Sequence, residues 1–454
     1  MTSGFIAAID LGTSKITGVI GRKNENNVIS VLASESIPSD NCIRRGTIYN
    51  IDKAGAIVKR LINMLENKLS VRIGKVYVSI GGQSIHTEVV REMKQLSSSG
   101  IVSETVVEQL RSSIEKYKPD MNRKYAVADV EYFLDDKAEK NPVGVTCSTI
   151  EAEYQIVVGR PNLSTNIEKT VVEKASLQIA DFIVGPLAAA AIALTNEEKE
   201  LGCAFIDFGA GTTDLSIYKG GVLRRLVTIP FGGRNITKDI AELNFIESDA
   251  EQYKIKFGKA KESNEGSLFS SPFSSKPDID LVELNKVIVM RLDEITANVK
   301  EQIHLSGYQE QLGAGLIITG GASQLKNLDI YLNQKLDLPV RKVSARKNQV
   351  NNNPELANDP AFTSALGMLL LGNTNCEKVV LEEYSDDNVT EEKKGGRGWG
   401  NFFGGGDKPQ KEQEPKAPKA PRKPKPESKK SINIGGKMKD IFSTMFDEVD
   451  DDEQ

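Results

Sequence analysis

The chain has 454 residues, of which 27% are charged and 39% hydrophobic, and its formal net charge is −5. This length exceeds what one hydrophobic core usually supports, so we expect more than one domain. The charge balance excludes a global basic field that would draw the chain to nucleic acid, and no nucleic-acid partner is expected. Only two histidines are present and the four cysteines form no CxxC pair, which argues against histidine-based triads, zinc sites and disulfide frameworks.

The N-terminal sequence MTSGFIAAIDLG has no basic region followed by an apolar run, so no signal peptide is expected. No run of about 18 apolar residues occurs, so no membrane-spanning helix is expected either. We therefore expect a protein that is made and kept in the cytoplasm. Any membrane contact must then come from a local surface segment.

Residues 1–384 alternate short apolar runs with longer helical patterns, which predicts an α/β fold. The elements expected in the first half are strands at 5–10, 16–21, 28–34 and 75–80 and helices at 52–69, 165–180 and 186–194. After residue 200 the opening pattern recurs, with strands expected at 202–207, 214–219 and 222–229. This recurrence indicates an internal duplication of architecture.

The first strand ends at an aspartate that is followed by a glycine turn. The residues concerned are Asp10, Gly12, Thr13, Ser14 and Lys15. The glycine permits a turn whose backbone N–H groups can face an anion. Asp10 suits Mg²⁺ bound through water, because Mg²⁺ takes one or two carboxylates together with phosphate oxygens, and Lys15 could neutralise phosphate charge. An ordinary hairpin with a Gly-Thr turn is the alternative.

The same plan returns about 197 residues later in the sequence FIDFGAGTTDL. Here Asp207 ends a strand, and the turn consists of Gly209, Ala210, Gly211, Thr212 and Thr213. Two unrelated hairpins would seldom share a strand-ending aspartate, a glycine two residues on and turn hydroxyls. We therefore expect the two turns to clamp one triphosphate from both sides, with Mg²⁺ between their aspartates.

A third glycine site follows the apolar run 316–318, at Gly320, Gly321 and Ala322. Glycines let the backbone approach a flat ring closely, so a purine could pack there, and a plain strand-to-helix turn is the alternative. A GxxxxGK[ST] loop is absent, and so is GxGxxG in a dinucleotide context, which excludes the corresponding nucleotide-binding classes.

In this order and spacing the three glycine sites resemble the nucleotide-binding signature of the actin, sugar kinase and DnaK-type chaperone superfamily. More specifically, residues 201–241 and 248–258 resemble the second phosphate segment and the adenosine-side helix of the FtsA family of bacterial cell-division proteins. The resemblance implies an actin-like fold with two lobes, built from duplicated ribonuclease H-like domains. It also implies that ATP and Mg²⁺ lie in the cleft between the lobes.

The resemblance adds residues to the expected site. Gly233 and Asn235 would lie near the ribose and the phosphates, and Glu251 and Lys254 would hydrogen-bond the ribose. The third glycine site would border the base, and Asp10 and Asp207 would hold Mg²⁺ through water. Without the resemblance, the pair on the later helix would be interpreted as part of a solvated helix face.

The resemblance also divides the chain into parts. The first lobe would occupy 1–84 and 163–198, and the second lobe would have its core at 199–246 and 315–384. Two small subdomains would lie at 85–162, inserted in the first lobe, and at 247–314. A relocated inserted subdomain would serve filament contacts and the recruitment of later division proteins.

Past residue 384 the composition changes abruptly. Residues 385–430 contain glycine clusters and a Pro/Lys/Glu-rich stretch that cannot bury enough apolar surface to become ordered, which predicts a disordered linker. Residues 431–454 recover a helical period, with apolar side chains at Met438, Ile441, Phe442, Met445, Phe446 and Val449. We expect this amphipathic helix to bind an anionic or neutral membrane surface, and a protein partner is the alternative. The acidic residues at the C-terminal end of this segment oppose the helix dipole and are repelled by anionic lipid, so the depth and strength of anchoring stay open; they are Asp447, Glu448, Asp450, Asp451, Asp452 and Glu453.

The leading hypothesis is an ATP-binding, actin-like cell-division protein. It would polymerise on the inner face of the cytoplasmic membrane at the division septum, tether the FtsZ ring there and recruit later division proteins. ATP turnover would be slow at most, because no residue qualifies as a catalytic base. The alternatives are an actin-like pilus-assembly adaptor and a sugar or small-metabolite kinase. A kinase needs an aspartate base beside an acceptor pocket and has no use for a tethered amphipathic tail.

Overall fold

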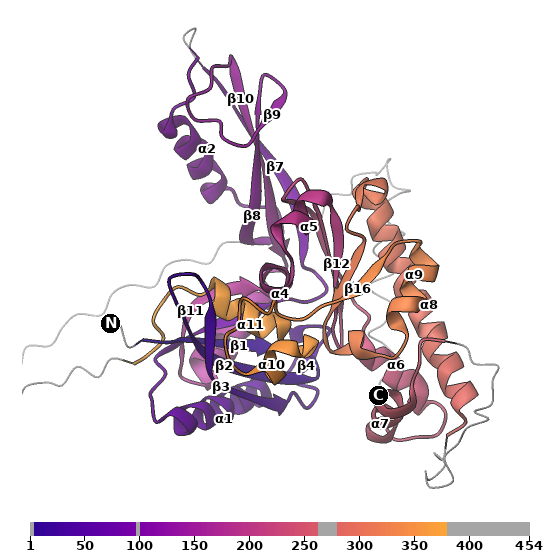
Figure 1. Cartoon of the computed structure of the whole chain (residues 1–454). Coiled ribbons are helices and arrows are strands. Elements are labelled where there is room, and N and C mark those ends of the chain that lie inside the picture. Colours follow the sequence, from indigo (N-terminus) through magenta and orange to yellow (C-terminus); the bar gives the residue numbers. More distant parts are fainter. Residues whose placement is uncertain (1–3, 97–99, 262–278, 379–454) are drawn as a thin grey trace, which may run out of the picture. The chain divides into compact units, whose positions relative to one another are not determined.

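The computed structural model describes residues 4–96, 100–261 and 279–378. The chain divides into two units, Met1–Glu382 and Glu383–Gln454, and every described residue belongs to the first unit (Figure 1). The expected linker at 385–430 and the expected helix at 431–454, with its six apolar positions, lie outside the described residues. Within the described ranges, no helix combines the length and the apolarity needed to cross a membrane.

The first lobe is built on a five-stranded sheet in the order β11-β6-β1-β2-β3. Its strands are β1 (Ile6–Leu11), β2 (Lys15–Lys23), β3 (Ile29–Pro38), β6 (Lys75–Ile80) and β11 (Gln178–Val184). The first three form an antiparallel meander, whereas β6 is parallel to β1 and β11 is parallel to β6.

Helices cover both faces of this sheet. A Cβ atom on Gly18 would meet Leu61 and Leu65 of α1 (Ile51–Leu69), whereas one on Gly21 would meet Leu369 of α11 (Thr363–Leu371). Positions an odd number apart on a strand face opposite sides, so the two helices sandwich the sheet. Burial on both faces explains why β1 and β6 are almost continuously apolar in sequence.

The second lobe repeats this topology in the order β16-β15-β12-β13-β14. Its strands are β12 (Cys203–Phe208), β13 (Thr213–Lys219), β14 (Val222–Ile229), β15 (Leu316–Thr319) and β16 (Val340–Lys342). Again a three-stranded antiparallel meander is followed by two strands that run parallel to its first strand. The internal duplication predicted from the sequence is confirmed.

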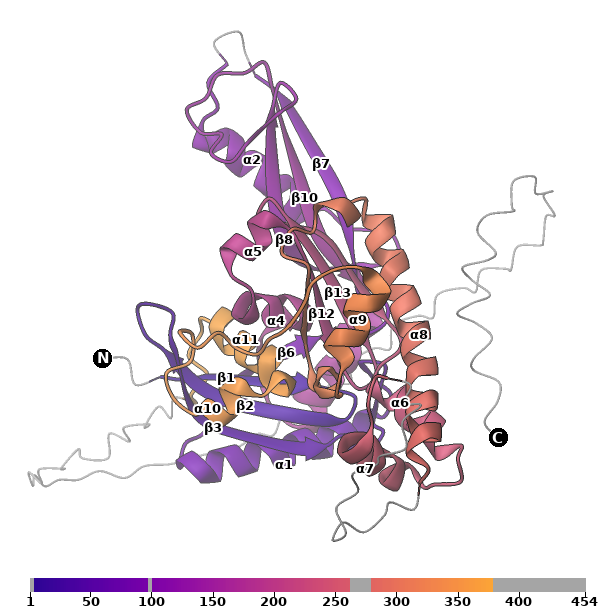
Figure 2. The ribbon, with the colours of Figure 1, turned by 45° about the vertical axis from the view of Figure 1, so that its right-hand side comes forward.

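The segment expected as an inserted subdomain has a core of its own. It comprises β7 (His86–Gln95), α2 (Glu104–Lys116), β8 (Arg123–Leu134), β9 (Lys137–Glu139) and β10 (Thr149–Gly159). Leu110 and Ile114 of α2 pack against this small sheet, and Figure 2 shows α2 standing away from both lobe sheets.

Although this segment interrupts the first lobe in sequence, its sheet continues that of the second lobe. Strand β7 pairs with β14 at His86 and Val227. The Arg224 guanidinium on β14 also donates two hydrogen bonds to the Glu131 carboxylate on β8, at 2.7 and 3.1 Å. Both groups are mostly buried, so this bidentate ion pair fixes the segment to the second lobe.

Two helices separate the lobe sheets. Helix α4 (Gly185–Ala193) contacts β11 of the first sheet and β12 and β13 of the second, and it packs closely on α11. A Cβ atom on Gly367 of α11 would overlap the carbonyl of Ala188 on α4, so the two backbones touch at this crossing. In Figure 1 the two helices lie side by side between β11 of the first sheet and β12 of the second.

The remaining helices complete the two lobes. They are α3 (Asn162–Glu168), α5 (Asn196–Leu201), α6 (Gly233–Ala241), α7 (Glu247–Phe257), α8 (Leu281–Ser306), α9 (Leu328–Leu336) and α10 (Pro354–Asn358). A π-helical turn at Lys169–Lys174 extends α3. The helix expected at 165–180 is wrong beyond this turn, because Gln178 begins β11 and pairs in parallel with β6.

Candidate functional site

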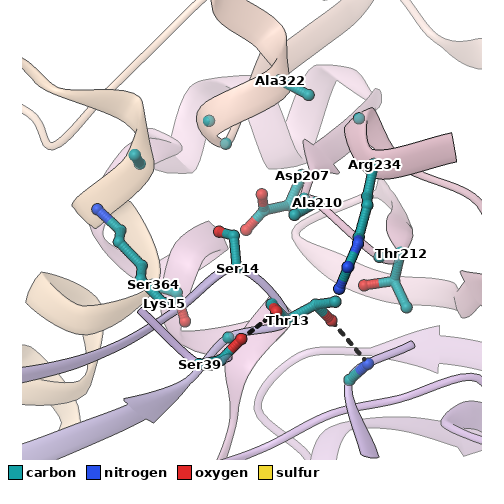
Figure 3. A pocket seen from close by; sticks show the side chains of 18 of the residues that line it. Thr13, Ser14, Lys15, Ser39, Asp207, Ala210, Thr212, Arg234, Ala322 and Ser364 are labelled. Carbon is teal, nitrogen blue, oxygen red and sulfur yellow. Dashed lines mark hydrogen bonds between the residues drawn. The ribbon is translucent and has the colours of Figure 1, made fainter. Parts of the chain in front are cut away.

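A cavity of about 830 Å³ lies between the two lobes, where the turn after β1 and the turn after β12 face each other (Figure 3). Its volume falls in the range of small-molecule sites. The cavity is lined by most of the predicted site residues, namely Asp10, Gly12, Thr13, Ser14, Lys15, Asp207, Gly209, Ala210, Gly211, Thr212, Gly233, Glu251, Lys254, Gly320, Gly321 and Ala322. The three glycine sites, which are far apart in sequence, therefore share one cavity.

Two of the residues predicted for the nucleotide site, Thr213 and Asn235, do not line this cavity. The buried Thr213 hydroxyl donates to the Phe231 carbonyl at 2.8 Å. The Asn235 side-chain oxygen accepts from the Gly232 N–H at 3.0 Å and thereby caps the start of α6. Both side chains bond to the local backbone and are not among the residues that line the cavity.

The first turn is held tightly by its surroundings. A Cβ atom on Gly12 would lie 2.6 Å from the Lys15 carbonyl oxygen, so the turn requires glycine there. The Thr13 hydroxyl accepts from the Gly46 N–H at 3.0 Å, and the Ser39 hydroxyl donates to the Thr13 carbonyl. The turn is thus fixed from both sides before any ligand binds.

The second turn has the same geometry and a different support. The Gly209 N–H donates to the Thr212 carbonyl at 2.9 Å, which closes the turn. The N–H groups of Gly233 and Arg234 donate to the carbonyls of Gly209 and Ala210, at 3.0 and 2.7 Å. The first residues of α6 are therefore joined directly to the second turn by two backbone hydrogen bonds.

The two turns contact each other across the cleft. A Cβ atom on Gly211 would lie 2.5 Å from the Thr13 hydroxyl oxygen, closer than any side chain tolerates. Glycine at this position lets the second lobe approach the first turn directly. A polyphosphate in the cavity would have backbone N–H groups of both lobes around it.

Three carboxylates gather at the strand ends beneath the turns. Asp10 and Asp207 line the cavity as predicted, and Asp214 lines it as well. Asp214 lies opposite Asp207 in the register of β12 and β13, just as Thr17 lies opposite Asp10 in β1 and β2. The sequence analysis missed Asp214, although the equal length of the two turns gives the same register in both hairpins.

Burial and mutual repulsion perturb these carboxylates. Burial, with repulsion from Asp214 and Asp10, raises the pKa of Asp207 to about 8. Burial also raises the pKa of Asp214 to about 6, although hydrogen bonds from Thr228 and Thr212 oppose this rise. The pKa of Asp10 is raised by burial too, against a hydrogen bond from Ser79 and the charge of Lys15. A bound cation would stabilise the charged forms of all three groups.

The carboxylates fit Mg²⁺ only together with other ligands. Among the described residues, no group of three or more histidine, cysteine, aspartate or glutamate side chains is arranged to hold a metal ion by itself. Mg²⁺ commonly keeps several waters and takes substrate phosphates with one or two carboxylates. The carboxylates of this cleft could supply one or two such ligands, and water and phosphate oxygens would complete the set.

The cations of the site differ in how they are held. The Lys15 ammonium lies 3.7 Å from the centroid of the Phe362 ring, and in Figure 3 its side chain points away from Asp207. Burial lowers the pKa of Lys15, while the charges of Asp359 and Asp10 oppose this shift. Lys15 therefore stands at the wall of the cavity on an aromatic face.

Lys254 is tied into the second lobe. Its ammonium donates to the Gly233 carbonyl, the Thr237 hydroxyl and the Glu251 carboxylate, at 2.8, 2.8 and 2.6 Å. Burial lowers the pKa of Lys254, and Glu251 opposes this shift. The interpretation as a solvated helix face is wrong for Lys254, whose side chain is only 12% exposed.

Arg234 is a further cavity residue that the sequence analysis missed. It lines the cavity directly after Gly233, and its Nε donates to a Glu247 carboxylate oxygen at 2.7 Å. In Figure 3 its side chain extends from α6 across the cavity in the direction of Thr13. The sequence signal for Arg234 was its position in the run GGRN, between two residues that were predicted for the site. The direction of its guanidinium could not be predicted, because it depends on how α6 is placed against the cavity.

Comparisons with known proteins give the family and the fold. A family model described as "Cell division protein FtsA" matches residues 204–367. The chain is 34% identical over 329 residues to the cell division protein FtsA of Porphyromonas gingivalis, covering 71% of this chain and 68% of the relative. It is 28% identical over 411 residues to the FtsA of Neisseria meningitidis serogroup B, covering 87% of this chain and 95% of the relative.

The fold is similar to that of a solved chain in a PilM–PilN type IV pilus biogenesis complex. This similarity has a TM-score of 0.56 at 16% identity and covers 81% of this chain and 98% of that chain. At such low identity it concerns the fold alone, which is actin-like and two-lobed, as predicted. The sequence relatives, in contrast, are cell-division proteins, and they do not favour the kinase alternative. The chain belongs to the FtsA family of cell-division proteins.

Proposed function

We propose that this protein binds ATP with Mg²⁺ in the cleft and polymerises on the inner face of the cytoplasmic membrane at the division site. There it tethers FtsZ and recruits later division proteins. The observation that carries the nucleotide proposal is the contact between the two turns at Gly211 and Thr13, above three carboxylates. Polymerisation, FtsZ and the later partners are proposed from the family.

Each part of the cleft suits one part of ATP. The two turns offer backbone N–H groups to the phosphates, and Asp10, Asp207 and Asp214 offer negative charge to Mg²⁺. Glu251 and Lys254 stand on α7 where the ribose would lie. The backbone at Gly321 is open, because a Cβ atom there would find its nearest neighbour 3.6 Å away, which leaves room for a flat base.

Nucleotide binding would act on the rest of the molecule through the lobes. A triphosphate that bridges the two turns favours the closed cleft over an open one, because only the closed form offers both sets of donors. The second turn is hydrogen-bonded to the start of α6, and α6 packs on α7 and α8 of the same lobe, so a displacement of the turn would carry these helices with it. ATP would thus determine the relative position of the two lobes, and a filament contact that depends on this position would form more readily with ATP bound.

Membrane attachment is proposed for the segment 431–454. Its apolar stripe would bury part of six side chains in the interface, where full burial of one such side chain is worth about 1.5–3 kcal/mol. One such helix binds reversibly, whereas many helices on one filament bind far more firmly through effective concentration. Polymerisation and membrane binding would then reinforce each other.

Co-sedimentation of the full chain with liposomes tests these steps together. We expect Mg²⁺-ATP to increase the sedimented fraction, and deletion of residues 431–454 to abolish it. The substitutions F442E and F446E together should release the protein, whereas S443E with T444E adds the same charge beside the stripe and should retain more binding. Full retention by the phenylalanine variant would exclude the tail as the anchor.

Recruitment of purified FtsZ to the same liposomes tests the tethering step. We expect FtsZ to sediment only with the full chain, and its failure to do so would contradict the tether. ATP consumption in the presence of a panel of sugars tests the kinase alternative. Rapid turnover that depends on a sugar would favour a kinase, and we expect none.

A further inference from the structure

We propose that Arg234 is a specificity-determining residue of this site, whose guanidinium leaves Glu247 and binds the phosphates of a nucleoside triphosphate. The inference rests on the proposed nucleotide function and deepens it. It assigns the recognition of the polyphosphate to a side chain of α6, in addition to the backbone of the two turns.

The backbone of Arg234 is hydrogen-bonded to the second turn, which is proposed to bind phosphate. Its N–H donates to the Ala210 carbonyl at 2.7 Å, and the next residue of that turn, Gly211, touches Thr13 of the first lobe. The side chain therefore starts within one residue of the place where the two turns meet. From there it extends across the cavity toward the first turn, as seen in Figure 3.

The other cations that line the cavity are Lys15, Lys254 and Lys326, and each has a partner elsewhere; the Lys326 ammonium donates to the Lys256 carbonyl at 2.9 Å. The Lys15 ammonium lies over the Phe362 ring, and Lys254 is bound by three oxygen atoms of its own lobe. Arg234 has one carboxylate partner, Glu247, through a single nitrogen, Nε. Its planar guanidinium carries further N–H donors in a geometry that matches phosphate.

The ion pair with Glu247 can be exchanged for a ligand. The Glu247 side chain is 45% exposed, so water can solvate its carboxylate when the guanidinium leaves. Partly exposed pairs of this kind contribute little stability, whereas a guanidinium bound to phosphate makes two parallel charge-assisted hydrogen bonds. The exchange therefore favours a ligand that carries several phosphate charges over one that carries few.

Nucleotide affinities of three variants test the inference. We would measure the dissociation constants of ATP, ADP and AMP with Mg²⁺ by calorimetry on the full chain, for the wild type, R234Q, R234K and E247Q. We expect R234Q to weaken ATP binding about tenfold or more and AMP binding less than about threefold. The ATP affinity of R234K should lie between those of the wild type and R234Q. Lysine keeps the positive charge but lacks the planar guanidinium that makes two parallel hydrogen bonds to phosphate.

E247Q changes only the partner and should move affinity in the opposite direction. A neutral amide holds the guanidinium less strongly, so ATP should bind more tightly than to the wild type while AMP changes little. If the Arg234–Glu247 pair had a purely structural role, the result would differ. R234Q and E247Q would then weaken the binding of ATP, ADP and AMP by similar factors. This variant also keeps the test decisive if R234Q folds poorly.

The outcomes separate this inference from the proposed function. If the wild type binds ATP and R234Q binds it equally well, or loses ATP, ADP and AMP by equal factors, the role of Arg234 is wrong and the nucleotide site stands. If the wild type binds no nucleotide at all, both proposals are overturned.

Discussion

The two hairpins that border the cleft have the same backbone and different chemistry. In each, an aspartate ends the first strand and a glycine two residues later approaches a carbonyl three residues beyond it. The residue across the hairpin differs, because Asp10 faces Thr17 in the first lobe whereas Asp207 faces Asp214 in the second. Like charges directly opposite each other destabilise a sheet, so the second hairpin carries a cost, when both carboxyls are ionised, that the first does not.

This difference separates the roles of the two lobes. In the first hairpin the Thr17 hydroxyl shares a hydrogen bond of 3.0 Å with Ser36, and the strand is satisfied without a ligand. In the second hairpin, burial and the neighbouring carboxylates raise the pKa of Asp207 to about 8. The two hairpins thus share one backbone plan, and the second one adds a pair of buried carboxylates whose charged forms a bound cation would stabilise.

The largest expected effect comes from the contact between the hairpins. In Gly211→Val the new side chain would collide with Thr13, which should separate the lobes and remove measurable ATP binding while the second lobe stays folded. Calorimetry with ATP and circular dichroism of the full chain would measure the two properties. Gly12→Val, in contrast, strikes the Lys15 carbonyl within its own hairpin and should lower the melting temperature as well.

A matched control for these variants is Gly307→Asn. Gly307 ends α8 in a left-handed conformation that asparagine also adopts, a Cβ atom there meets nothing within 4 Å, and the residue does not line the cavity, so ATP affinity should stay close to that of the wild type. Unchanged ATP affinity in Gly211→Val would remove the second turn from the site and break the symmetry between the hairpins.

The second prediction makes the two hairpins alike. Asp214→Thr gives the second hairpin the cross-strand pair of the first, and a threonine suits the strand. We expect the strengthening of ATP binding by Mg²⁺ to fall by about 10- to 100-fold, as when a residue supporting a metal site is lost. Thr17→Val is the matched control in the first hairpin and should keep the Mg²⁺ effect. Equal Mg²⁺ dependence in Asp214→Thr and the wild type would contradict a cation site on the second hairpin.

Patterns local in sequence allowed most of the fold to be predicted. The two meanders, the helix at 52–69 and the turns with their aspartates all follow from apolar periodicity and glycine positions. Strand β11 was missed, because residues 178–184 become a strand only through parallel pairing with β6, which lies about 100 residues earlier in the chain. Long-range pairing of this kind leaves no periodic signal.

The misses at the site have the same origin. The position of Asp214 opposite Asp207 depends on the register of the hairpin. The sequence pattern suggests this register, but only the strand pairing fixes it. The direction of Arg234 depends on how α6 joins the second turn, and the position of Lys15 depends on Phe362, which is distant from it in the sequence. Backbone turns could be predicted from the sequence, whereas the partners of charged side chains could not.

The smallest expected effect concerns the pH dependence of stability without nucleotide or metal. An aspartate in the unfolded chain has its ordinary pKa of 3.8, whereas the folded protein raises the pKa to about 8 for Asp207 and to about 6 for Asp214. The folded state therefore binds more protons than the unfolded state between these values. The free energy of unfolding must then decrease as the pH rises from about 4 to about 8.

Asp214→Asn should flatten this decrease, because it removes one titrating carboxylate and part of the repulsion that raises the pKa of Asp207. In a chelator at pH 8 we expect the variant to melt a few degrees above the wild type, and at pH 4 to melt at a similar temperature. Asp136→Asn is the control, because Asp136 is exposed in a left-handed turn that asparagine also adopts. With saturating Mg²⁺-ATP the order at pH 8 should reverse, since the cation favours the charged carboxylates. Parallel melting curves for all three proteins across this range would show that the paired carboxylates of the second hairpin carry no strain for a cation to relieve.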